Sequence, residues 1–387
     1  MKKIQIIILA LAAVFAASCQ KTEPYNGEFD QVMIYVGSAY NNLSANIRHD
    51  LTHELSVGDI PDYRDKKAII AFTHNTMSDG ANYTTKMPPC LIRLYKKQGE
   101  AVLDTIKVFP TNYVDTDVDH FKDVLNSIQT NYKSKHYGMV YSSHGSGWVP
   151  CQYYSGASPA PAPKSLGAEF DTSVRYSYEM DIMELAKALP MHLDYLVFDA
   201  CLMGGIEVAY ELKDKCDYIV GSPTEILSYG LHYETMAGYL LRYKPDLESV
   251  CKDYIKNCSQ GSIGLYDCSQ LKNLAEVCKG LNSKYRNEIA RVSKYDVQEY
   301  YTGNHPWYFD LEDIYTNAGM ESADRAALSS ALEKAVPYCD ATPHFLSIVI
   351  DLNRYCGMSM YLPSAGNSTL NAYYKGYAWN RDCGLVE

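Results

Sequence analysis

Two reactive side chains follow two short apolar segments of this chain. His144 comes soon after Gly138 to Ser142, and Cys201 comes soon after Tyr195 to Phe198. Short apolar runs are typical of strands covered on both faces, so both side chains are expected at the carboxyl ends of strands. A thiol near its reference pKa of about 8.5 is mostly protonated at neutral pH, and a nearby imidazole can hold it as thiolate or take its proton. If the two strands are neighbours, this pair is equipped for nucleophilic catalysis.

Backbone amides beside the pair are candidates for binding a developing oxyanion. Gly145 has no side chain, so its N–H can approach the reacting carbonyl closely, and the N–H of Cys201 is a second candidate donor. Each such donor is commonly worth about 3 kcal/mol. The helical spacing of Leu202 to Lys213 also predicts that Cys201 lies near a helix N-terminus, where the helix dipole favours a thiolate.

Strands and helices that position these residues alternate along the chain. Stretches with helical spacing separate many of the apolar runs, for example around Phe121 to Ile128 and Met183 to Leu189. This alternation predicts an α/β fold with a largely parallel sheet, in which ligand sites lie beyond the carboxyl ends of the strands. The predicted strands are Val32 to Val36, Ala68 to Thr73, Leu91 to Tyr95, Gly138 to Ser142, Tyr195 to Phe198, Tyr218 to Val220, Ile263 to Tyr266 and Leu346 to Ile350.

Two regions depart from this rhythm. Residues 151–178 are rich in Pro, Ala, Ser and Gly, so they are expected to form a long exposed loop between the two reactive residues. Residues 281–387 are rich in helical patterns and either complete the sheet or form a small second lobe. The expected core of the fold is therefore residues 31–280.

The N-terminus has the pattern of an export signal. Lys2 and Lys3 precede an apolar stretch, Ile4 to Phe15, which is too short to span a bilayer as a mature helix. The small residues before Cys19 resemble a bacterial lipoprotein signal at residues 1–18, in which that cysteine is lipidated and becomes the first mature residue. Residues 19–30 then form a polar tether. The alternative is a signal peptide whose cleavage leaves a free, soluble protein.

Composition narrows the classes of partner. The 387 residues are 47% hydrophobic and carry a formal net charge of -11, without a sustained Lys/Arg run, so a nucleic-acid partner is not expected. Of the twelve cysteines, those other than Cys19 and Cys201 can be disulfide-bonded or free and buried. No C-x-x-C occurs, and the Cys and His spacing does not fit a structural zinc site.

Two motifs resemble the clostripain family of cysteine peptidases, in the caspase-like clan. The resemblance is strong over Ser142 to Trp148 and over Phe198 to Gly204, and it extends to Asn41 to Ser44 and to Asp310 and Leu311. It implies a caspase-like three-layer sandwich, with a mostly parallel central sheet flanked by helices and a helical C-terminal elaboration. It also implies a secreted cysteine endopeptidase whose catalytic dyad, His144 and Cys201, needs no third acid.

The resemblance further places Asp199 in the S1 pocket and implies cleavage after Arg or Lys at P1. A buried carboxylate does attract a guanidinium or ammonium strongly. The alternative role of Asp199 is to cap the helix that follows. After Gly221 to Glu225 the chain lacks the Trp that the family pattern predicts, so the far wall of S1 stays unassigned.

Some relatives are activated by self-cleavage between the two motifs, and here Lys164 and Arg175 are the basic residues available, with Lys164 preferred. The alternative is a plain surface loop.

The same resemblance allows for calcium dependence, because relatives in this family can depend on calcium. Asp115, Asp117 and Asp119 offer oxygen ligands, but they do not complete an EF-hand, and a solvated turn before Phe121 also explains them. No cofactor or metal is assigned.

Two other functions compete with this one. A serine hydrolase would use Ser146, although no G-x-S-x-G pattern surrounds it. A non-catalytic lipoprotein would use the same scaffold only to bind ligands at the surface. The favoured hypothesis is a monomeric peptidase that acts on protein or peptide substrates. It is expected to be held to a membrane through Cys19, in the periplasm or at the cell surface.

Overall fold

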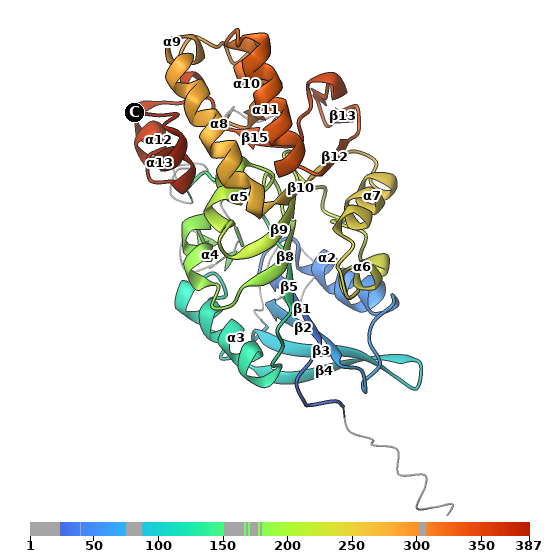
Figure 1. Cartoon of the computed structure of the whole chain (residues 1–387). Coiled ribbons are helices and arrows are strands. Elements are labelled where there is room, and N and C mark those ends of the chain that lie inside the picture. Colours follow the sequence, from blue (N-terminus) through green and yellow to red (C-terminus); the bar gives the residue numbers. More distant parts are fainter. Residues whose placement is uncertain are drawn as a thin grey trace, which may run out of the picture.

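A nine-stranded sheet runs through the molecule, with helices on both of its faces (Figure 1). The computed structural model describes residues 24–38, 40–74, 87–150, 166–167, 169–170, 177–178, 180–301 and 307–387. In spatial order the strands are β12 (Tyr338–Ala341), β10 (Ser262–Asp267), β9 (Cys216–Gly221), β8 (Leu193–Asp199), β5 (Tyr137–Ser142), β1 (Gln31–Ser38), β2 (Lys67–His74), β3 (Cys90–Lys97) and β4 (Glu100–Val108).

Five neighbouring strands of the sheet, β9, β8, β5, β1 and β2, run parallel to one another. The antiparallel strands β10 and β12 extend the sheet beyond β9, and the antiparallel strands β3 and β4 extend it beyond β2. The parallel strands are apolar at nearly every position because they are buried on both faces. In β1, Ile34 and Val36 belong to one hydrophobic core, whereas Met33 and Tyr35 belong to the core on the opposite face. Successive side chains of a strand point to opposite faces, so one continuous apolar run serves two layers.

Helices cover the sheet in two layers, which makes a three-layer sandwich (Figure 1). The smaller layer holds α2 (Ser44–His49), its continuation as a π-helix η1 (Asp50–Leu55), α6 (Tyr233–Leu240) and α7 (Leu247–Asn257). The larger layer holds α3 (Val118–Asn131), α4 (Ile182–Ala188), α5 (Ile206–Leu212), α8 (Leu271–Lys284), α9 (Arg286–Ile289), α10 (Leu311–Asn317), α11 (Ser322–Ala335), α12 (Ser368–Tyr374) and α13 (Ala378–Cys383).

Shorter elements complete the described chain. The 3-10 turns are η3 (Cys268–Gln270), η4 (Leu352–Arg354) and η5 (Pro363–Ala365). Three small antiparallel pairs join β6 (Glu169–Phe170) to β7 (Ser177–Tyr178), β11 (Phe309–Asp310) to β15 (Ser359–Met360), and β13 (His344–Phe345) to β14 (Ile348–Val349).

The predicted fold class is confirmed, with three differences in detail. The strand predicted at Leu346 to Ile350 is wrong, because the chain turns at Leu346 with φ of +50° and forms only the β13–β14 hairpin. The edge strand β4 escaped prediction because its side chains are mostly exposed and its sequence mixes polar with apolar residues, without a long apolar run. The helix predicted from Leu202 begins only at Ile206, since Leu202 itself has φ of +63°.

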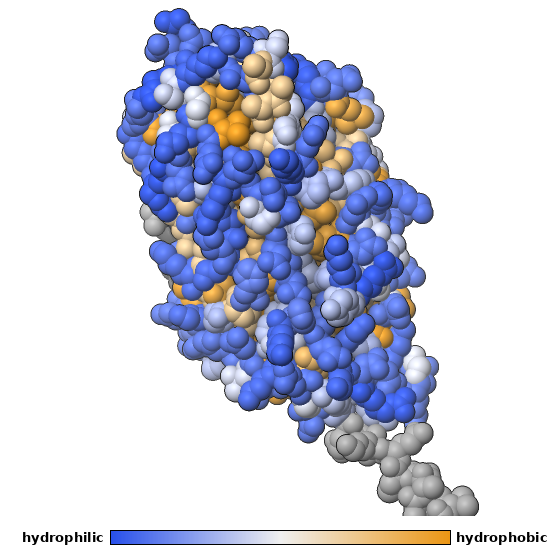
Figure 2. Space-filling view, viewed as in Figure 1, coloured by the Kyte–Doolittle hydropathy of each residue, from blue (hydrophilic) through white to orange (hydrophobic). Residues whose placement is uncertain are grey.

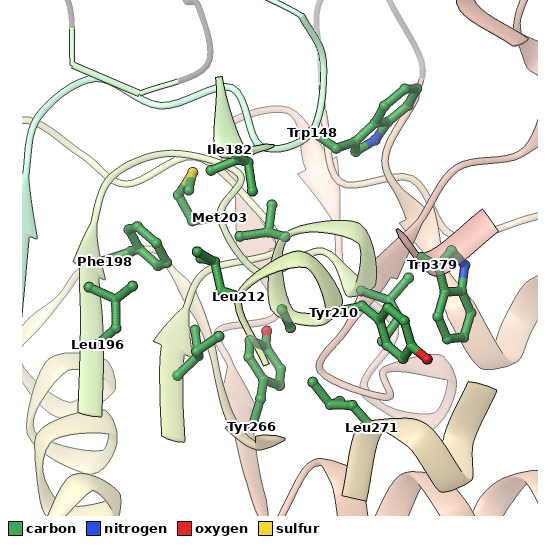
Figure 3. Close-up of a cluster of buried hydrophobic side chains, with 14 of the residues drawn as sticks. Trp148, Ile182, Leu196, Phe198, Met203, Tyr210, Leu212, Tyr266, Leu271 and Trp379 are labelled. Atoms are coloured by element: carbon green, nitrogen blue, oxygen red, sulfur yellow. The ribbon is translucent and has the colours of Figure 1, made fainter. Parts of the chain in front are cut away.

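Aromatic side chains of the larger core connect the loop after β5 to the C-terminal part of the chain. Figure 3 shows part of this core, with Trp148 from that loop and Trp379 from α13 among its buried side chains. The ring of Trp148 lies 4.8 Å from that of Tyr361 and 5.0 Å from that of Tyr374. The hydroxyl of Tyr308 donates to the carbonyl of Ser146 at 2.6 Å. Because fully buried aromatic side chains dominate core energetics, these contacts hold the loop that carries His144.

The face seen in Figure 2 is largely hydrophilic, with scattered hydrophobic side chains. Among the described residues, no helix combines the length and apolar character needed to cross a membrane.

The ten cysteines in the described part of the chain are all free thiols, and the sulfur atoms of Cys216 and Cys268 lie 4.0 Å apart. Most of these thiols are buried or half-buried and pack as small hydrophobic groups.

Candidate active site

The two reactive residues leave the sheet from neighbouring strands. β5 and β8 are parallel partners, and Ser142 lies opposite Asp199 in their register. The chain reaches His144 and Cys201 two residues later in each case. Both residues line one pocket of about 310 Å³ at this edge of the sheet. The structure therefore brings together the pair that the sequence predicted.

His144 is fixed by a residue that sequence reasoning did not assign to the site. Its Nε2 lies 2.6 Å from Oδ1 of Asn42, in the turn between β1 and α2. The neighbouring Asn41 shapes this turn, because its Oδ1 accepts the amide of Leu43 at 2.8 Å. Burial lowers the pKa of His144 to about 4, so the ring is neutral at pH 7.

The thiol of Cys201 is held by the backbone of Ile226. Its Sγ donates to the carbonyl oxygen at 3.5 Å and accepts from the amide at 3.3 Å. Burial raises the pKa of this thiol to about 12, and the carboxylate of Glu225 adds to the increase. The expected effect of a helix dipole is absent, because α5 begins five residues further on. The pocket thus holds a neutral thiol and a neutral imidazole.

Gly145 packs against the backbone of Cys201 so closely that no other residue fits. A Cβ at this position would lie 2.6 Å from the carbonyl oxygen of Cys201 and 3.2 Å from its amide nitrogen. Among the described residues, none accepts a hydrogen bond from the Gly145 amide, and the amide of Cys201 reaches only its own thiol. Within the described part of the chain, these two amides are therefore not engaged by another residue.

Asp199 lies at the floor of the pocket. Its Oδ2 accepts from Oγ of Ser142 at 3.1 Å and from the hydroxyl of Tyr233 at 2.5 Å. Burial raises the pKa of Asp199, and these two hydrogen bonds lower it in part. Gly230 closes the pocket beside it, since a Cβ there would be 2.5 Å from the same oxygen. The alternative role as a helix cap is wrong, because Gly205 occupies the N-cap position of α5.

Further residues of the pocket were not identified from the sequence. Asp50, the first residue of η1, lines the pocket and is only 3% exposed. Burial raises its pKa to about 8, with further contributions from the charges of Asp199 and Glu54. The polar run Asn41 and Asn42 after an apolar strand was a usable signal for the pocket wall. Asp50 gave none, because only the tertiary fold brings it beside Asp199.

Ser146 is not positioned to act as a nucleophile. Its side chain is fully buried, and it does not line the pocket that holds His144 and Cys201. Its Oγ has no hydrogen-bond partner among the described residues. The serine-hydrolase alternative is therefore wrong.

The three aspartates considered for calcium lie in different surroundings. Asp117 caps α3, accepting the amides of Asp119 at 3.1 Å and His120 at 3.0 Å. Asp115 is buried instead, with Oδ1 3.5 Å from Nδ1 of His74. The first turn of α3 explains Asp117 without a metal. Cys19, Lys164 and Arg175 lie outside the described residues.

Sequence comparison identifies the family. A family model described as the Clostripain family matches residues 63–385, which is most of the chain. The chain belongs to the clostripain family. Clostripain-family proteins are cysteine proteases, so this chain is an enzyme of that class. A search of curated proteins returned no match.

Solved structures of clostripain-family proteins, called C11 proteases in their descriptions, share the fold. An inactive zymogen C11 protease from Parabacteroides distasonis is 25% identical, with a TM-score of 0.76 over 93% of this chain and 99% of that one. A secreted C11 cysteine protease from Bacteroides thetaiotaomicron is 24% identical, with a TM-score of 0.74 over 92% and 100%. A complex of a secreted C11 cysteine protease from that organism with an irreversible peptide inhibitor is 23% identical, with a TM-score of 0.75 over 92% and 99%.

Proposed function

We propose that the protein is a cysteine endopeptidase in which His144 and Cys201 form the catalytic dyad and Asp199 selects Arg or Lys at P1. One observation carries this proposal: both reactive residues and Asp199 line a single pocket at the carboxyl ends of two paired strands. Pockets at this edge of a parallel sheet are the usual ligand sites of α/β folds.

The chemistry follows from the resting geometry. Sγ of Cys201 leaves the backbone of Ile226 and turns toward His144, which takes the thiol proton as the sulfur attacks the substrate carbonyl carbon. As the Asn42 side chain is placed, its oxygen accepts from Nε2–H, so Nδ1 keeps the lone pair that receives this proton. A base with a lowered pKa and a thiol with a raised pKa require proton transfer to accompany attack.

The tetrahedral intermediate carries an oxyanion, which the amides of Gly145 and Cys201 stabilise by donation. The C–N bond of the substrate then breaks, and His144 gives its proton to the leaving amine. A thioester on Cys201 remains. Water, deprotonated by His144, hydrolyses this thioester and restores the free thiol.

Selection of a basic P1 side chain rests on charge. Among the described residues, the side chains that line the pocket include three carboxyl groups, those of Asp50, Asp199 and Glu225, and no Lys or Arg. A buried carboxylate binds a guanidinium or ammonium through charge-assisted hydrogen bonds. A peptide with Asp or Leu at P1 offers no such donor, so its cleavage is expected to be weak.

The test compares wild type with Cys201→Ala and with Cys90→Ala, which removes a half-buried thiol in β3. Wild type and Cys90→Ala are expected to cleave peptides with Arg or Lys at P1, and Cys201→Ala is expected to be at least about a thousandfold slower. Equal activity of wild type and Cys201→Ala would refute the thiol mechanism. Equal cleavage after Leu and Arg would refute the role of Asp199.

We also propose self-activation by cleavage within residues 151–178. Of the two basic residues there, Lys164 is the preferred cleavage site and Arg175 is the second candidate. The similar P. distasonis protein is described as an inactive zymogen, which is consistent with such a step. Incubation of wild type beside Cys201→Ala, followed by mass spectrometry, tests it. Two fragments from wild type alone, with Lys164→Ala intact, support the site, whereas a wild-type chain that stays whole and fully active contradicts it.

Export and anchoring through Cys19 form a separate proposal. A similar B. thetaiotaomicron protein is described as secreted. Lipidation adds about 0.8 kcal/mol of membrane affinity for each buried CH₂ group, so acyl chains on Cys19 would hold the protein at a membrane. Full-length protein is expected to partition into detergent as a monomer, and Cys19→Ser is expected to stay in the aqueous phase. Aqueous partition of both forms would exclude the lipid.

A further inference from the structure

Three hydroxyl groups form a closed cluster behind the active site, and the catalytic steps proposed above do not use them. Ser222 and Thr224 follow β9, and Ser262 begins β10. The Oγ of Ser262 lies 3.1 Å from Oγ of Ser222 and 2.9 Å from Oγ1 of Thr224, and those two oxygens lie 3.1 Å apart. All three side chains are fully buried, and none of them lines the pocket that holds Cys201. Because a buried hydroxyl group is unfavourable unless it is hydrogen-bonded, each of the three depends on the other two.

The cluster lies where the ladder between β9 and β10 ends. Gly221 pairs with Gly264, and two positions further along this register Ser262 would face Pro223. Proline has no backbone N–H, so the ladder cannot continue there. The side chain of Ser262 supplies a bond in its place, because its Oγ accepts the amide of Thr224 at 3.1 Å. The segment after β9 is thus held to β10 by a side chain instead of by the sheet.

The hydrogen bonds of the cluster continue toward the active site. The hydroxyl of Thr224 donates to the carbonyl oxygen of Glu225 at 3.0 Å. Because each hydroxyl has only one proton to donate, Thr224 then accepts a hydrogen bond from Ser262 or Ser222. Hydrogen bonds that are linked in this way polarise one another, so the loss of one hydroxyl weakens the rest of the cluster.

The segment held by the cluster fixes the backbone next to the nucleophile. The carbonyl oxygen of Thr224 accepts the amide of Leu202 at 2.9 Å. The carbonyl oxygen of Ser222 accepts the amide of Gly204 at 2.8 Å. Leu202 directly follows Cys201 and has φ of +63°, a conformation that a leucine keeps only where its surroundings enforce it. Release of the segment would let Leu202 relax and would displace the adjacent amide of Cys201.

The same segment contacts the thiol. Ile226, two residues after Thr224, donates its amide to Sγ of Cys201 at 3.3 Å. Burial and the charge of Glu225 raise the pKa of this thiol, and the hydrogen bond from Ile226 lowers it in part. An N–H donor stabilises a thiolate more than a neutral thiol, so this amide favours the form that attacks the substrate.

We infer that Ser262 and Thr224 are positioning residues of the peptidase, whose hydroxyl groups act through the segment after β9 to hold the thiol and the amide of Cys201 in place. This inference rests on the proposed function, in which Cys201 is the nucleophile. Both residues lie outside the pocket, so they act only through the residues that they hold. A displacement of about 1 Å at a reacting group can reduce the rate about a hundredfold, so such support has a measurable effect.

The kinetic experiment removes one hydroxyl group without changing the shape of the side chain. Thr224→Val replaces the hydroxyl with a methyl group, Thr224→Ser keeps the hydroxyl, and Thr73→Val is the matched control, a buried threonine of β2 whose hydroxyl contacts Cys90 at 3.4 Å. Thr224→Val is expected to lower kcat about tenfold, whereas Thr224→Ser and Thr73→Val stay near wild type. Equal kcat for wild type and Thr224→Val, or an equal loss in Thr224→Ser, would overturn the inference.

Alkylation of Cys201 separates this inference from the proposed function, because it requires no peptide turnover. The rate of labelling by iodoacetamide at pH 8 is followed by peptide mapping on the folded proteins. Thr224→Val and Ser262→Ala are expected to slow the labelling of Cys201 at least about fivefold relative to Thr73→Val, because the amide of Ile226 no longer faces the sulfur. If wild type cleaves no peptide but this pattern holds, the proposed function fails and the positioning of the thiol stands. If wild type is an active peptidase and the labelling is unchanged or faster, the inference alone fails.

A double variant tests whether the two hydroxyl groups act as one unit. Urea denaturation first identifies conditions in which every variant is folded, and Ser262→Ala tests the same cluster from β10 if Thr224→Val does not fold. Groups that act through one segment are not additive, so Thr224→Val combined with Ser262→Ala is expected to lower kcat no more than about twofold beyond the larger single effect. A loss equal to the product of the two single effects would show independent roles and would overturn the shared path.

Discussion

Two buried carboxyl groups of this protein, Asp310 and Asp50, have opposite surroundings. Asp310 caps α10, and its oxygens accept from the amide of Asp313 at 3.0 Å, the hydroxyl of Tyr300 at 2.7 Å and the amide of Cys356 at 2.8 Å. Asp50 accepts no hydrogen bond from the described residues, and its titratable neighbours include the carboxyl groups of Asp199 and Glu54 and the ring of His49. The carboxyl group of Asp310 therefore has its hydrogen-bond donors within the fold, whereas that of Asp50 has none among the described residues.

This difference separates residues kept for stability from residues kept for binding. A buried acceptor surrounded by donors contributes to the free energy of unfolding, and its removal leaves those donors unpaired. A buried carboxyl group without donors costs stability until a ligand supplies them. Burial alone does not distinguish these cases, since it raises the pKa of both groups, to about 6 for Asp310 and about 8 for Asp50.

The largest expected effects come from two substitutions, one that lowers activity and one that lowers the free energy of unfolding. Asp199→Asn is expected to lower kcat/KM on an Arg peptide at least about a hundredfold, because it removes a buried negative partner of the substrate cation. Its amide oxygen can still accept from Ser142 and Tyr233, so its free energy of unfolding is expected to stay near that of wild type. Asp310→Ala is expected to lower that free energy by about 3 kcal/mol with activity per folded molecule retained. Urea denaturation and steady-state kinetics measure both. The comparison breaks if the two variants show the same pattern.

Glycines offer a second comparison between the pocket and the rest of the fold. Gly145→Ala forces a Cβ against the backbone of Cys201 and is expected to reduce kcat about a hundredfold, the usual effect of losing one oxyanion donor. Gly280→Ala, on the exposed side of α8 with no atom near the new Cβ, is expected to stabilise the protein by up to about 1 kcal/mol. Full activity of Gly145→Ala would remove that amide from the mechanism.

Thiol reactivity distinguishes Cys201 from the buried cysteines of the core. Since the pKa of Cys201 is raised to about 12, its alkylation by iodoacetamide in the free enzyme is expected to accelerate about tenfold per pH unit between pH 6 and 9. Cys251, which is fully buried and lies outside the pocket, is expected to stay unmodified in the folded protein. Peptide mapping assigns the label. A plateau below pH 8 would indicate a preformed thiolate and contradict the resting state described above.

The smallest effect concerns Asn42, which orients the imidazole from an exposed turn. Asn42→Ala is expected to lower kcat about tenfold with KM unchanged, because His144 loses its hydrogen-bond partner but not its place in the pocket. Asn42→Asp, which keeps an oxygen acceptor, should recover most of this loss. A change in KM without a change in kcat would assign Asn42 to substrate binding instead.

Sequence alone predicted what local patterns determine. The strands before His144 and Cys201 are buried on both faces, so their residues form apolar runs that stand out from their surroundings. Asp50 was missed as a site residue because only the pairing of β1 with β5 brings η1 to the pocket, whereas the polar run at Asn42 after an apolar strand was a signal that could have been used. The start of α5 was placed too early because helical spacing does not report the positive φ of Leu202.

The register of β5 and β8 has a consequence for the chain between them. Five pairs of residues in the register of these strands, rather than the covalent connection, set the height at which both reactive residues leave the sheet. A polypeptide cut between residues 151 and 165 would therefore remain a complementing pair of fragments, with one half contributing the base and the other the nucleophile. The two fragments on either side of this cut, when expressed separately, are expected to reassemble into an active enzyme.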